Sequence, residues 1–372
     1  MHISLHITTG CNMSCKYCYS PPTERFDMPE EVAFQSIDFI EENYPTNTGI
    51  IFFGGEPLLK KNLIQETIAY ANKKTNYYHY KVSTNGLLLD ESFLVYANSV
   101  NLQISISIDG NEQAHDTFRH FADGQPTFKA IEKKIALLLK YQPYAKCLMT
   151  ISPETVIYYA DSIEYLVKCG FKYLIISLNY AGDWSDTSLK ILKKQYLMIS
   201  KFYEKLIMEE RKVYISPFEM KLASHIRQHN YECYQCHLAK EQISIAHDGK
   251  IYPCVQFVKD GISNTNYSIG SVYSGMDTTL QKQMYADSKK QDANVKCMEC
   301  VYNQRCNNKC SCLSWQLTGS LNKVSPIVCE SERILIPIVD RLGERLYRKG
   351  AKMFIQKHYN AVYPILSMIE DM

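Results

Sequence analysis

The chain opens with the stretch ISLHITTGCNMSCKYC, residues 3–18, in which a short β-branched run leads directly into three cysteines. The run at residues 3–8 predicts a β-strand. Cys11, Cys15 and Cys18 are spaced as C-x3-C-x2-C, so one short loop offers three thiolates. This spacing favours metal or iron–sulfur ligation over disulfides. Three cysteines leave one iron of a 4Fe–4S cube without a protein ligand, and we expect chemistry at that iron.

Five more β-branched runs follow, with amphipathic stretches between them. We predict strands at residues 3–8, 49–53, 78–83, 102–108, 145–151 and 172–178. Ala33, Ile37 and Ile40 fall at helical spacing after Pro29, a residue that suits the start of a helix. The alternation predicts an α/β fold of parallel βαβ units, either an open doubly wound sheet or a partial barrel.

Conspicuous residues follow four of the predicted strands directly. They lie in residues 11–18, 54–57, 84–86 and 109–119. Parallel α/β folds bind ligands at the carboxyl ends of their strands. We therefore expect these four loops to form one site.

Composition and charge narrow the class of protein. The 372 residues exceed one average domain, and a hydrophobic content of 46% suits a sizeable core. The net charge of +2 gives no electrostatic case for nucleic acid or an anionic membrane as a partner. The N-terminus lacks a secretion signal, and no apolar run reaches the roughly 18 residues of a membrane span. We expect a cytoplasmic protein whose cysteines stay reduced.

A second group of cysteines lies in residues 231–330, where helical and strand periodicity weakens. The C-x2-C pairs of this group also suit a zinc ribbon, which is the alternative to iron–sulfur ligation. Cys147 and Cys169 lie apart from it, in a predicted strand and at a predicted helix end. We expect these two to be buried core thiols.

The first cysteine loop, with Tyr17 inside it, and the Gly-Gly-Glu-Pro turn at residues 54–57 together resemble the radical S-adenosylmethionine superfamily. The resemblance implies that Cys11, Cys15 and Cys18 hold a 4Fe–4S cluster whose fourth iron binds S-adenosylmethionine. Cleavage of that cofactor would yield a 5′-deoxyadenosyl radical that removes a hydrogen atom from the substrate. The implied cofactor contacts are Tyr17 for the adenine, Ser107 and Arg119 for the carboxylate, and Gly54, Gly55, Glu56 and Pro57 for the ammonium.

The catalytic acid or base is not apparent from the sequence. His115 and His120 are candidates, because they flank the rim where the cofactor is expected; His115 lies in the segment at residues 107–119, which resembles sulfatase maturases. The alternative for His115 is a solvated loop position.

The second cysteine group resembles the SPASM extension of that superfamily, named after maturases of subtilosin, pyrroloquinoline quinone, sulfatases and mycofactocin. The resemblance implies two auxiliary 4Fe–4S clusters, and therefore three clusters in all. We assign one auxiliary cluster to Cys233, Cys236, Cys254 and Cys310, and the other to Cys297, Cys300, Cys306 and Cys329. Cys312 is the alternative to Cys233.

The two resemblances imply three parts of the chain. Residues 1–212 would form a partial (β/α)6 TIM-like barrel with a bridging helix, and residues 213–330 the SPASM domain. Residues 331–372 would form a helical tail, which we expect to be helical from Arg333 onward.

For function, the resemblance implies an oxidoreductase that modifies ribosomally made peptides. We expect a thioether crosslink in a cysteine-containing peptide. In sulfatase maturases an aspartate, thought to be the base, follows the cysteine equivalent to Cys254, whereas Val255 and Gln256 follow it here. Formylglycine formation and carbon–carbon crosslinking are therefore the alternatives, and a cysteine-rich electron-transfer protein is the alternative outside enzymology.

Two protein partners are expected besides the precursor peptide. Only ten residues precede Cys11, so we expect the leader peptide to be bound by a separate protein or by the enzyme's own surface. The reductant is expected to be a flavodoxin or a ferredoxin.

Overall fold

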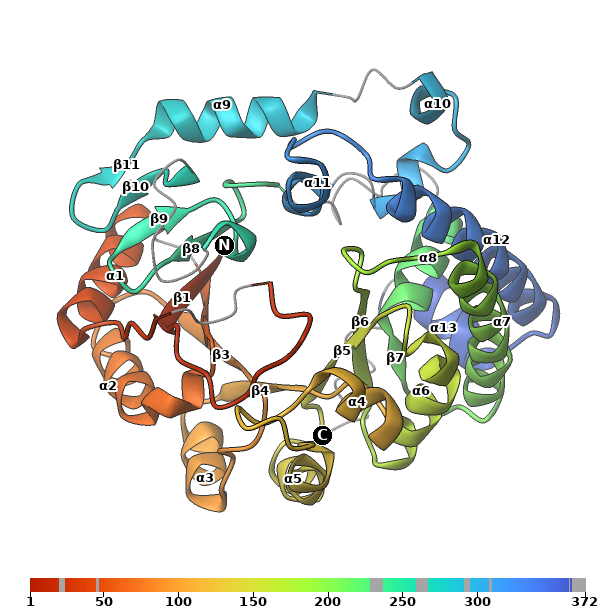
Figure 1. The fold of residues 1–372 in the computed structure, drawn as a ribbon, viewed down its shortest axis with the longest axis horizontal. Coiled ribbons are helices and arrows are strands. Elements are labelled where there is room, and N and C mark those ends of the chain that lie inside the picture. Colours follow the sequence, from red (N-terminus) through yellow and green to blue (C-terminus); the bar gives the residue numbers. More distant parts are fainter. Residues whose placement is uncertain are drawn as a thin grey trace.

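The computed structural model describes residues 1–19, 24–44, 47–227, 237–258, 267–290, 295–307, 310–360 and 362. Over these residues the strands form one sheet in the order β11-β10-β9-β8-β1-β2-β3-β4-β5-β6-β7. The sheet curves into an open barrel with helices on its outside (Figure 1). This architecture confirms the predicted α/β fold and, of its two forms, the partial barrel.

The six predicted strands are confirmed. They are β1 (His2–Thr8), β2 (Thr48–Gly54), β3 (Tyr78–Thr84), β4 (Leu102–Ser107), β5 (Lys146–Ile151) and β6 (Tyr173–Leu178). Each strand pairs in parallel with the next. Their carboxyl ends therefore share one rim, and the four conspicuous loops begin there.

The connecting helices cover the outer face of the sheet (Figure 1). Ile3, Leu5 and Ile7 of β1 are fully buried in the main core, whereas the alternating Ser4 and His6 face the inside of the barrel. The helices are α1 (Glu30–Asn43), α2 (Lys61–Ala71), α3 (Glu91–Ser99), α4 (Glu112–Phe118), α5 (Phe128–Tyr141), α6 (Tyr159–Lys168) and α7 (Asp186–Met208). The last of these is the predicted bridging helix.

The cysteine-rich region extends the sheet at both edges. At one edge β7 (Tyr214–Ile215) pairs with β6 and leads into α8 (Ser216–Arg227). At the other edge β8 (Gln242–Ile245) pairs in parallel with β1. Three short strands then continue in antiparallel pairs as β9 (Lys250–Tyr252), β10 (Gly270–Ser271) and β11 (Gly275–Met276). The region is thus joined to the barrel, and the predicted boundary at residue 212 stays a prediction.

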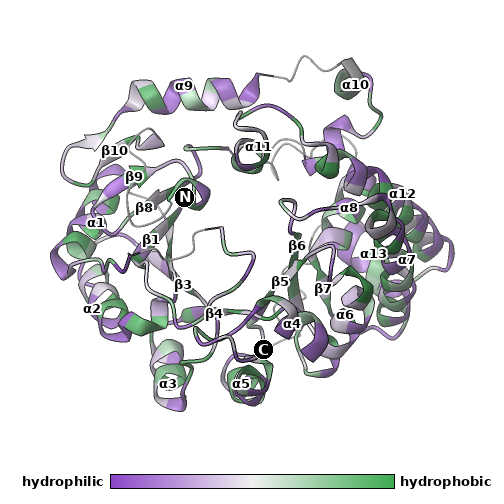
Figure 2. Cartoon of the chain, in the orientation of Figure 1, coloured by the Kyte–Doolittle hydropathy of each residue, from purple (hydrophilic) through white to green (hydrophobic). Residues whose placement is uncertain are grey.

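Three helices of this region span the gap between the two sheet edges in Figure 1. They are α9 (Thr278–Lys289), α10 (Val295–Met298) and α11 (Ser311–Thr318). Much of α9 is hydrophilic (Figure 2), and Met284 is its buried side chain. This helix therefore adds little to the hydrophobic core.

The C-terminal part is helical, with α12 (Pro326–Arg348) and α13 (Lys352–Tyr359). The helix begins at Pro326, before the predicted start at Arg333, because proline suits a first helical position. α12 packs against α7 and α8. None of the described helices is both long and apolar enough to cross a membrane.

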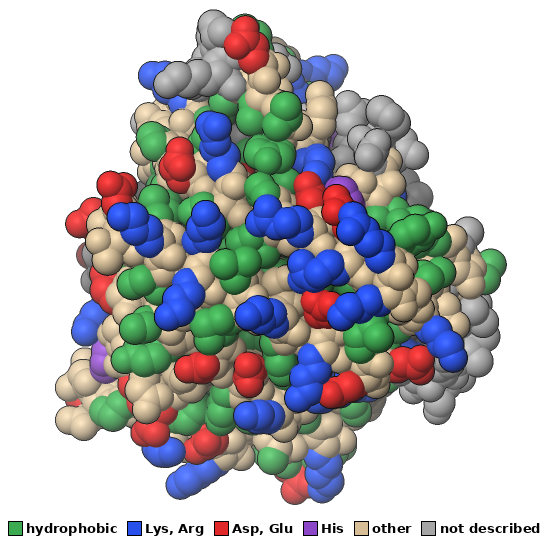
Figure 3. Space-filling view, turned by 90° about the vertical axis from the view of Figure 1, so that its right-hand side faces the viewer, with side chains coloured by type: hydrophobic (Ala, Val, Ile, Leu, Met, Phe, Trp, Pro, Cys, Tyr) green, Lys and Arg blue, Asp and Glu red, His purple; other side chains and the backbone are tan. Residues whose placement is uncertain are grey.

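The face on the side of α7 and α12 mixes side chains of several kinds. Lys and Arg are interspersed there with hydrophobic and acidic side chains (Figure 3). α7 contributes exposed lysines to the surface, among them Lys193, Lys194 and Lys201.

Candidate active site

The first cysteine loop lies along the segment that follows α4. The backbone amide of Ser14 donates to the carbonyl of His120 at 2.9 Å, and that of Lys16 donates to the carbonyl of Phe118 at 3.0 Å. Met13 and Phe121 form an isolated antiparallel bridge beside them. The loop after β1 and the loop after β4, far apart in the sequence, are therefore held together as the shared rim predicts.

Gly54 and Gly55 allow β2 to approach the cysteine loop closely. Gly54 has φ +137°, and a Cβ atom on it would lie 2.1 Å from the carbonyl oxygen of Thr8. A Cβ atom on Gly55 would lie 2.3 Å from the carbonyl oxygen of Gly10. Because neither glycine has a Cβ atom, the Gly55 amide can donate to the Thr8 carbonyl and the Glu56 amide to the Gly10 carbonyl, each at 2.8 Å. The glycines thus position the loop, and their predicted contact with an ammonium group stays a prediction.

The carboxylate of Glu56 joins the turn after β2 to the loop after β3. Its Oε1 accepts hydrogen bonds from the Leu58 amide at 2.9 Å and from Thr84 Oγ1 at 2.7 Å, and its Oε2 accepts one from the Asn85 amide at 2.7 Å. The side chain is fully buried, and burial raises the pKa of this carboxyl. Pro57 begins the short helix η1 (Pro57–Lys60) that Glu56 caps. The carboxylate of Glu56 thus positions the loop of residues 84–86, and the predicted contact of Glu56 with an ammonium group stays a prediction.

Asn85 is a residue of the site that the sequence did not single out. Its Nδ2 donates to Asn12 Oδ1 at 2.8 Å and lies 3.9 Å from Cys11 Sγ. The side chain is 7% exposed. Its position directly after β3, in the loop of residues 84–86, was the feature of the sequence that could have identified it as a site residue.

Asp109 joins two of the predicted cofactor residues. Its carboxylate accepts Arg119 Nε at 2.9 Å and Nη2 at 3.2 Å, and it also accepts the hydroxyl of Tyr17. The Thr150 amide donates to Asp109 Oδ1 at 2.9 Å. Ser107, another predicted contact, ends β4 just before this residue. Asp109 therefore joins Tyr17 of the cysteine loop and Arg119, the predicted partner of the cofactor carboxylate, in one hydrogen-bond network.

The guanidinium of Arg119 also faces the cysteine loop. Its Nη1 lies 4.0 Å from Cys15 Sγ, and its Cζ lies 5.4 Å from the centre of the Tyr17 ring. A cation at this position stabilises thiolates and favours an anionic ligand beside them.

His115 is buried, which rules out the solvated position considered for it. Its Nδ1 accepts the Asp109 amide at 3.3 Å, and its Nε2 lies 3.1 Å from Thr127 Oγ1, which itself donates to the Arg119 carbonyl. Burial lowers the pKa of this imidazole to about 3. Both ring nitrogens are engaged, so His115 braces the Asp109 loop, and an acid–base role stays untested.

The thiols of the loop fit an iron–sulfur cluster. Cys11 and Cys15 are half-buried and Cys18 is exposed, so none is packed away in the core. Burial raises the pKa of Cys11 to about 11, and the nearby Cys15 and Cys18 add to the rise. Among the described residues no three His, Cys, Asp or Glu side chains converge as ligands of a single metal ion. In a 4Fe–4S cluster each thiolate binds a different iron, which the C-x3-C-x2-C sequence of this loop allows.

In the second cysteine group, Cys254, Cys310 and Cys312 gather around one small core with Leu238, Tyr252 and Phe257. The Sγ atoms of Cys310 and Cys312 are 3.9 Å apart, and a hydrogen bond from Cys312 lowers the pKa of Cys310 to about 7. Cys233 and Cys236 lie outside the described residues. Cys312 thus lies beside Cys310, a predicted ligand of the auxiliary cluster for which Cys312 is the alternative to Cys233.

The remaining cysteines are placed as follows. Cys297 and Cys300 flank the end of α10, and Cys306 follows η6 (Asn303–Arg305). Cys329 lies in the first turn of α12. Outside both groups, Cys147 is fully buried as predicted, whereas Cys169 at the end of α6 is only half-buried.

Comparisons with known proteins agree with this geometry. Residues 5–166 match the family model of the radical SAM superfamily. An uncharacterised protein of Methanocaldococcus jannaschii is 29% identical over 202 residues, which are 53% of this chain and 66% of that protein. The cysteine-type anaerobic sulfatase-maturating enzyme of Clostridium perfringens strain 13 is 23% identical over 333 residues, which are 82% of this chain and 86% of that enzyme.

Solved structures share the fold. Native anSMEcpe with bound AdoMet and the Kp18Cys peptide matches with a TM-score of 0.77 at 18% identity, covering 93% of this chain and 100% of that one. Streptococcus suis SuiB bound to the precursor peptide SuiA matches with a TM-score of 0.58 at 14% identity, covering 88% and 75%. Residues 5–166, with the cysteine loop at the barrel rim, therefore form a radical SAM domain, and this domain together with the sulfatase-maturating relatives indicates a radical SAM enzyme.

Proposed function

We propose that this enzyme is a maturase that removes a hydrogen atom from a cysteine-containing, ribosomally made peptide and joins the cysteine sulfur to carbon as a thioether. The general part of this proposal, that the enzyme modifies a peptide or protein, is supported by what its relatives act on or bind. The C. perfringens relative is named for maturing sulfatases, and SuiB was solved with a precursor peptide.

The residues that follow Cys254 favour thioether formation over formylglycine formation. Formylglycine formation in sulfatase maturases is thought to use an aspartate as base directly after this cysteine. Here Val255 begins η4 (Val255–Phe257), and Gln256 accepts a hydrogen bond from Gln316. Neither residue can take up a proton near neutral pH, so this position lacks a general base.

The reaction removes two hydrogen atoms from the peptide. The bound cluster and S-adenosylmethionine supply the radical that takes one hydrogen atom from a substrate carbon. The sulfur–carbon bond would form as the thiol loses its proton, and an auxiliary cluster held by the second cysteine group would supply the acceptor for the remaining electron. The residues of this chain hold the reactants in place: Asp109 fixes Arg119, and Arg119 offers its cation beside Cys15.

The cofactor and cluster contacts expected from the sequence belong to this proposal. Three 4Fe–4S clusters are proposed, one on the loop of Cys11, Cys15 and Cys18 and two on the second cysteine group. The pairing of Cys254 and Cys310 on one auxiliary cluster is supported by their shared core. A separate leader-binding protein and a flavodoxin or ferredoxin as reductant are proposed as partners.

Formylglycine formation is the second candidate. Its support is the alignment with the C. perfringens enzyme, which extends beyond the barrel over 82% of this chain. The two reactions start with the same hydrogen abstraction and differ in whether sulfur is kept or lost.

Mass spectrometry of the product separates them. The reconstituted enzyme is incubated anaerobically with S-adenosylmethionine, a reductant and a small cysteine-rich peptide encoded next to its gene. The proposal expects 5′-deoxyadenosine, a peptide lighter by two hydrogen atoms, and a cysteine that no longer reacts with an alkylating reagent. An aldehyde at a cysteine or serine would establish the second candidate instead. Zinc-loaded protein without cofactor cleavage would refute both.

A further inference from the structure

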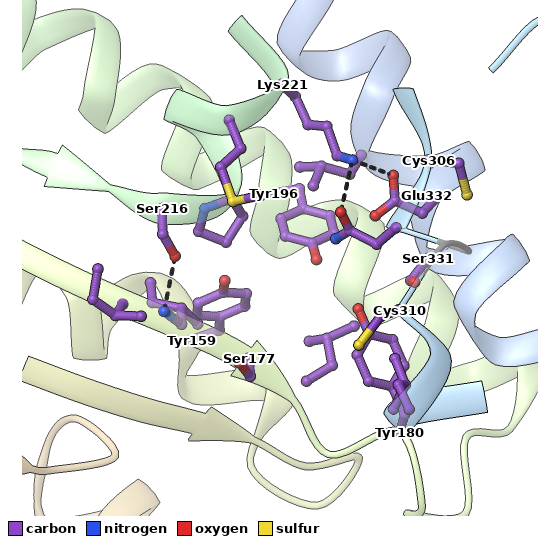
Figure 4. A pocket seen from close by; sticks show the side chains of 18 of the residues that line it. Tyr159, Ser177, Tyr180, Tyr196, Ser216, Lys221, Cys306, Cys310, Ser331 and Glu332 are labelled. Carbon is purple, nitrogen blue, oxygen red and sulfur yellow. Dashed lines mark hydrogen bonds and ion pairs between the residues drawn. The ribbon is translucent and has the colours of Figure 1, made fainter. Parts of the chain in front are cut away.

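A cavity of about 450 Å³ lies between the last long strand of the barrel and the cysteine-rich region. One end is formed by Tyr159, Tyr196 and Ser216, and the other by Cys306 and Cys310 (Figure 4). The volume is within the range of pockets that hold small ligands or large side chains. The cysteine end belongs to the proposed clusters, whereas the tyrosine end has no role in the proposed cluster or cofactor contacts.

The hydroxyl of Tyr159 is buried without a partner. The residue is 1% exposed, and among the described residues no hydrogen-bonding partner lies within reach of its Oη. Ser216 Oγ, in the same wall, accepts the Ile176 amide at 2.9 Å. A buried polar group without a partner costs about 1–3 kcal/mol, so its occurrence in a cavity wall points to a ligand atom.

The charged side chains of the cavity wall neutralise each other. Lys221 Nζ lies 2.7 Å from Glu332 Oε2, and the two side chains are 1% and 4% exposed. The same ammonium donates to the Arg305 carbonyl at 2.6 Å and to Asn307 Oδ1 at 3.4 Å. The ammonium is thus paired with a carboxylate and donates to two further oxygens, so among the described residues of the wall no charge is left unpaired for an ionised ligand.

Much of the rest of the wall is apolar or aromatic. The rings of Tyr159 and Tyr196 meet edge to face, with their centres 5.8 Å apart. Aliphatic side chains complete the wall, namely Ile175, Leu178, Met220, Leu313 and Leu335. Such a wall suits an aromatic side chain whose polar tip reaches the free hydroxyl.

We propose that this cavity is a specificity subsite that binds one uncharged aromatic side chain of the peptide substrate, tyrosine or tryptophan, with its polar tip on Tyr159. The proposal rests on the proposed peptide-modifying function. The cavity is bordered by β6 of the barrel and by the second cysteine group, so a peptide seated in it is held between the two.

Tyr159→Phe tests the hydroxyl in the reconstituted holoenzyme. Loss of one hydrogen bond should raise the KM for the peptide about two- to ten-fold, with a smaller change in kcat at saturating peptide. The midpoint of thermal unfolding should stay the same or rise, because the hydroxyl has no partner to lose. In the matched control Tyr203→Phe, the lost hydroxyl is a buried donor to Glu219, so the midpoint should fall while the KM is kept. An unchanged KM in Tyr159→Phe would contradict the role of the hydroxyl.

Ser177→Trp tests the cavity itself, because Ser177 lines it from β6 and a large side chain there fills it. The KM should rise more than in Ser177→Ala, and the wild-type preference for one aromatic position of the peptide should disappear. Equal KM values and equal preference would overturn the subsite. If the wild-type enzyme modifies no peptide at all, the proposed function fails instead, so the two failures are distinguishable.

Discussion

The carboxylate of Asp109 binds the guanidinium of Arg119 through two hydrogen bonds, at 2.9 Å and 3.2 Å, with both side chains almost removed from water. Their side chains are 2% and 10% exposed. The remaining nitrogen of Arg119 is the one that faces Cys15. An arginine held by two bonds cannot swing away, so Asp109 decides where the cation stands relative to the cysteine loop.

Asp109→Asn should destabilise the protein and impair cofactor binding. The substitution leaves a buried guanidinium without a counter-charge, which costs about 3–5 kcal/mol in the free energy of unfolding. Anaerobic unfolding in urea measures the loss, and the affinity for S-adenosylmethionine measures the effect on the site.

Asp38→Asn is the matched control for that substitution. Asp38 pairs with Lys74 at 2.5 Å, but their side chains are 32% and 26% exposed. A surface pair contributes about 0–1 kcal/mol, so the loss should be small. Equal losses in the two variants would contradict the importance given to the buried pair.

Gly55→Ala should prevent the cysteine loop from taking its place. The added Cβ would lie 2.3 Å from the Gly10 carbonyl, which is backbone and cannot turn away. The expected result is loss of iron from the first cluster and loss of cofactor cleavage, measured by iron analysis and 5′-deoxyadenosine formation.

Gly124→Ala is a control for the added methyl group, since no atom lies within 4 Å of its Cβ position. Its φ of +85° imposes some backbone strain, about 1–2 kcal/mol, but no clash. This variant should keep its iron. Full iron content in Gly55→Ala would show that the loop tolerates a wider separation from β2.

Much of the fold follows from local patterns. The alternation of β-branched runs and amphipathic stretches predicted parallel strands and the rim at their carboxyl ends, but it left open whether the sheet closes toward a barrel, which only the family resemblance implied. The bond between Tyr17 and Asp109 was not, because it joins residues 92 positions apart through side chains alone. The pairing of β8 with β1 was missed for a similar reason, since its four residues carry too little pattern to indicate a distant partner.

The stability of the protein should fall as the pH falls below about 6.5. Burial lowers the pKa of His6 from 6.5 to about 3, with a smaller contribution from the nearby His247. Between these two values the unfolded chain binds a proton that the folded chain does not, so the free energy of unfolding decreases toward acid. Unfolding measured at about pH 7 and about pH 5 should show the loss, which spans the range where histidines titrate.

His6→Phe should reduce this pH dependence, because phenylalanine takes up no proton and can still pack against Phe53, whose ring lies 5.2 Å from that of His6. His79→Phe, at an exposed position of β3, should leave it unchanged. The same loss between the two pH values in wild type and His6→Phe would show that other buried groups, such as His115, dominate.

Separate substitutions of Cys310 and Cys312 show which of the two cysteines binds an auxiliary cluster and which only lies beside it. If Cys310 is a ligand and Cys233 completes its cluster, Cys310→Ala should reduce the iron content from about twelve to about eight per chain, as expected for the loss of one of three four-iron clusters. Cys312→Ala should then keep all of its iron. Because the two sulfur atoms are 3.9 Å apart, removal of Cys312 would withdraw its hydrogen bond from Cys310 and shift the reduction potential of the cluster instead. Loss of four irons in Cys312→Ala would make Cys312 the ligand in place of Cys233.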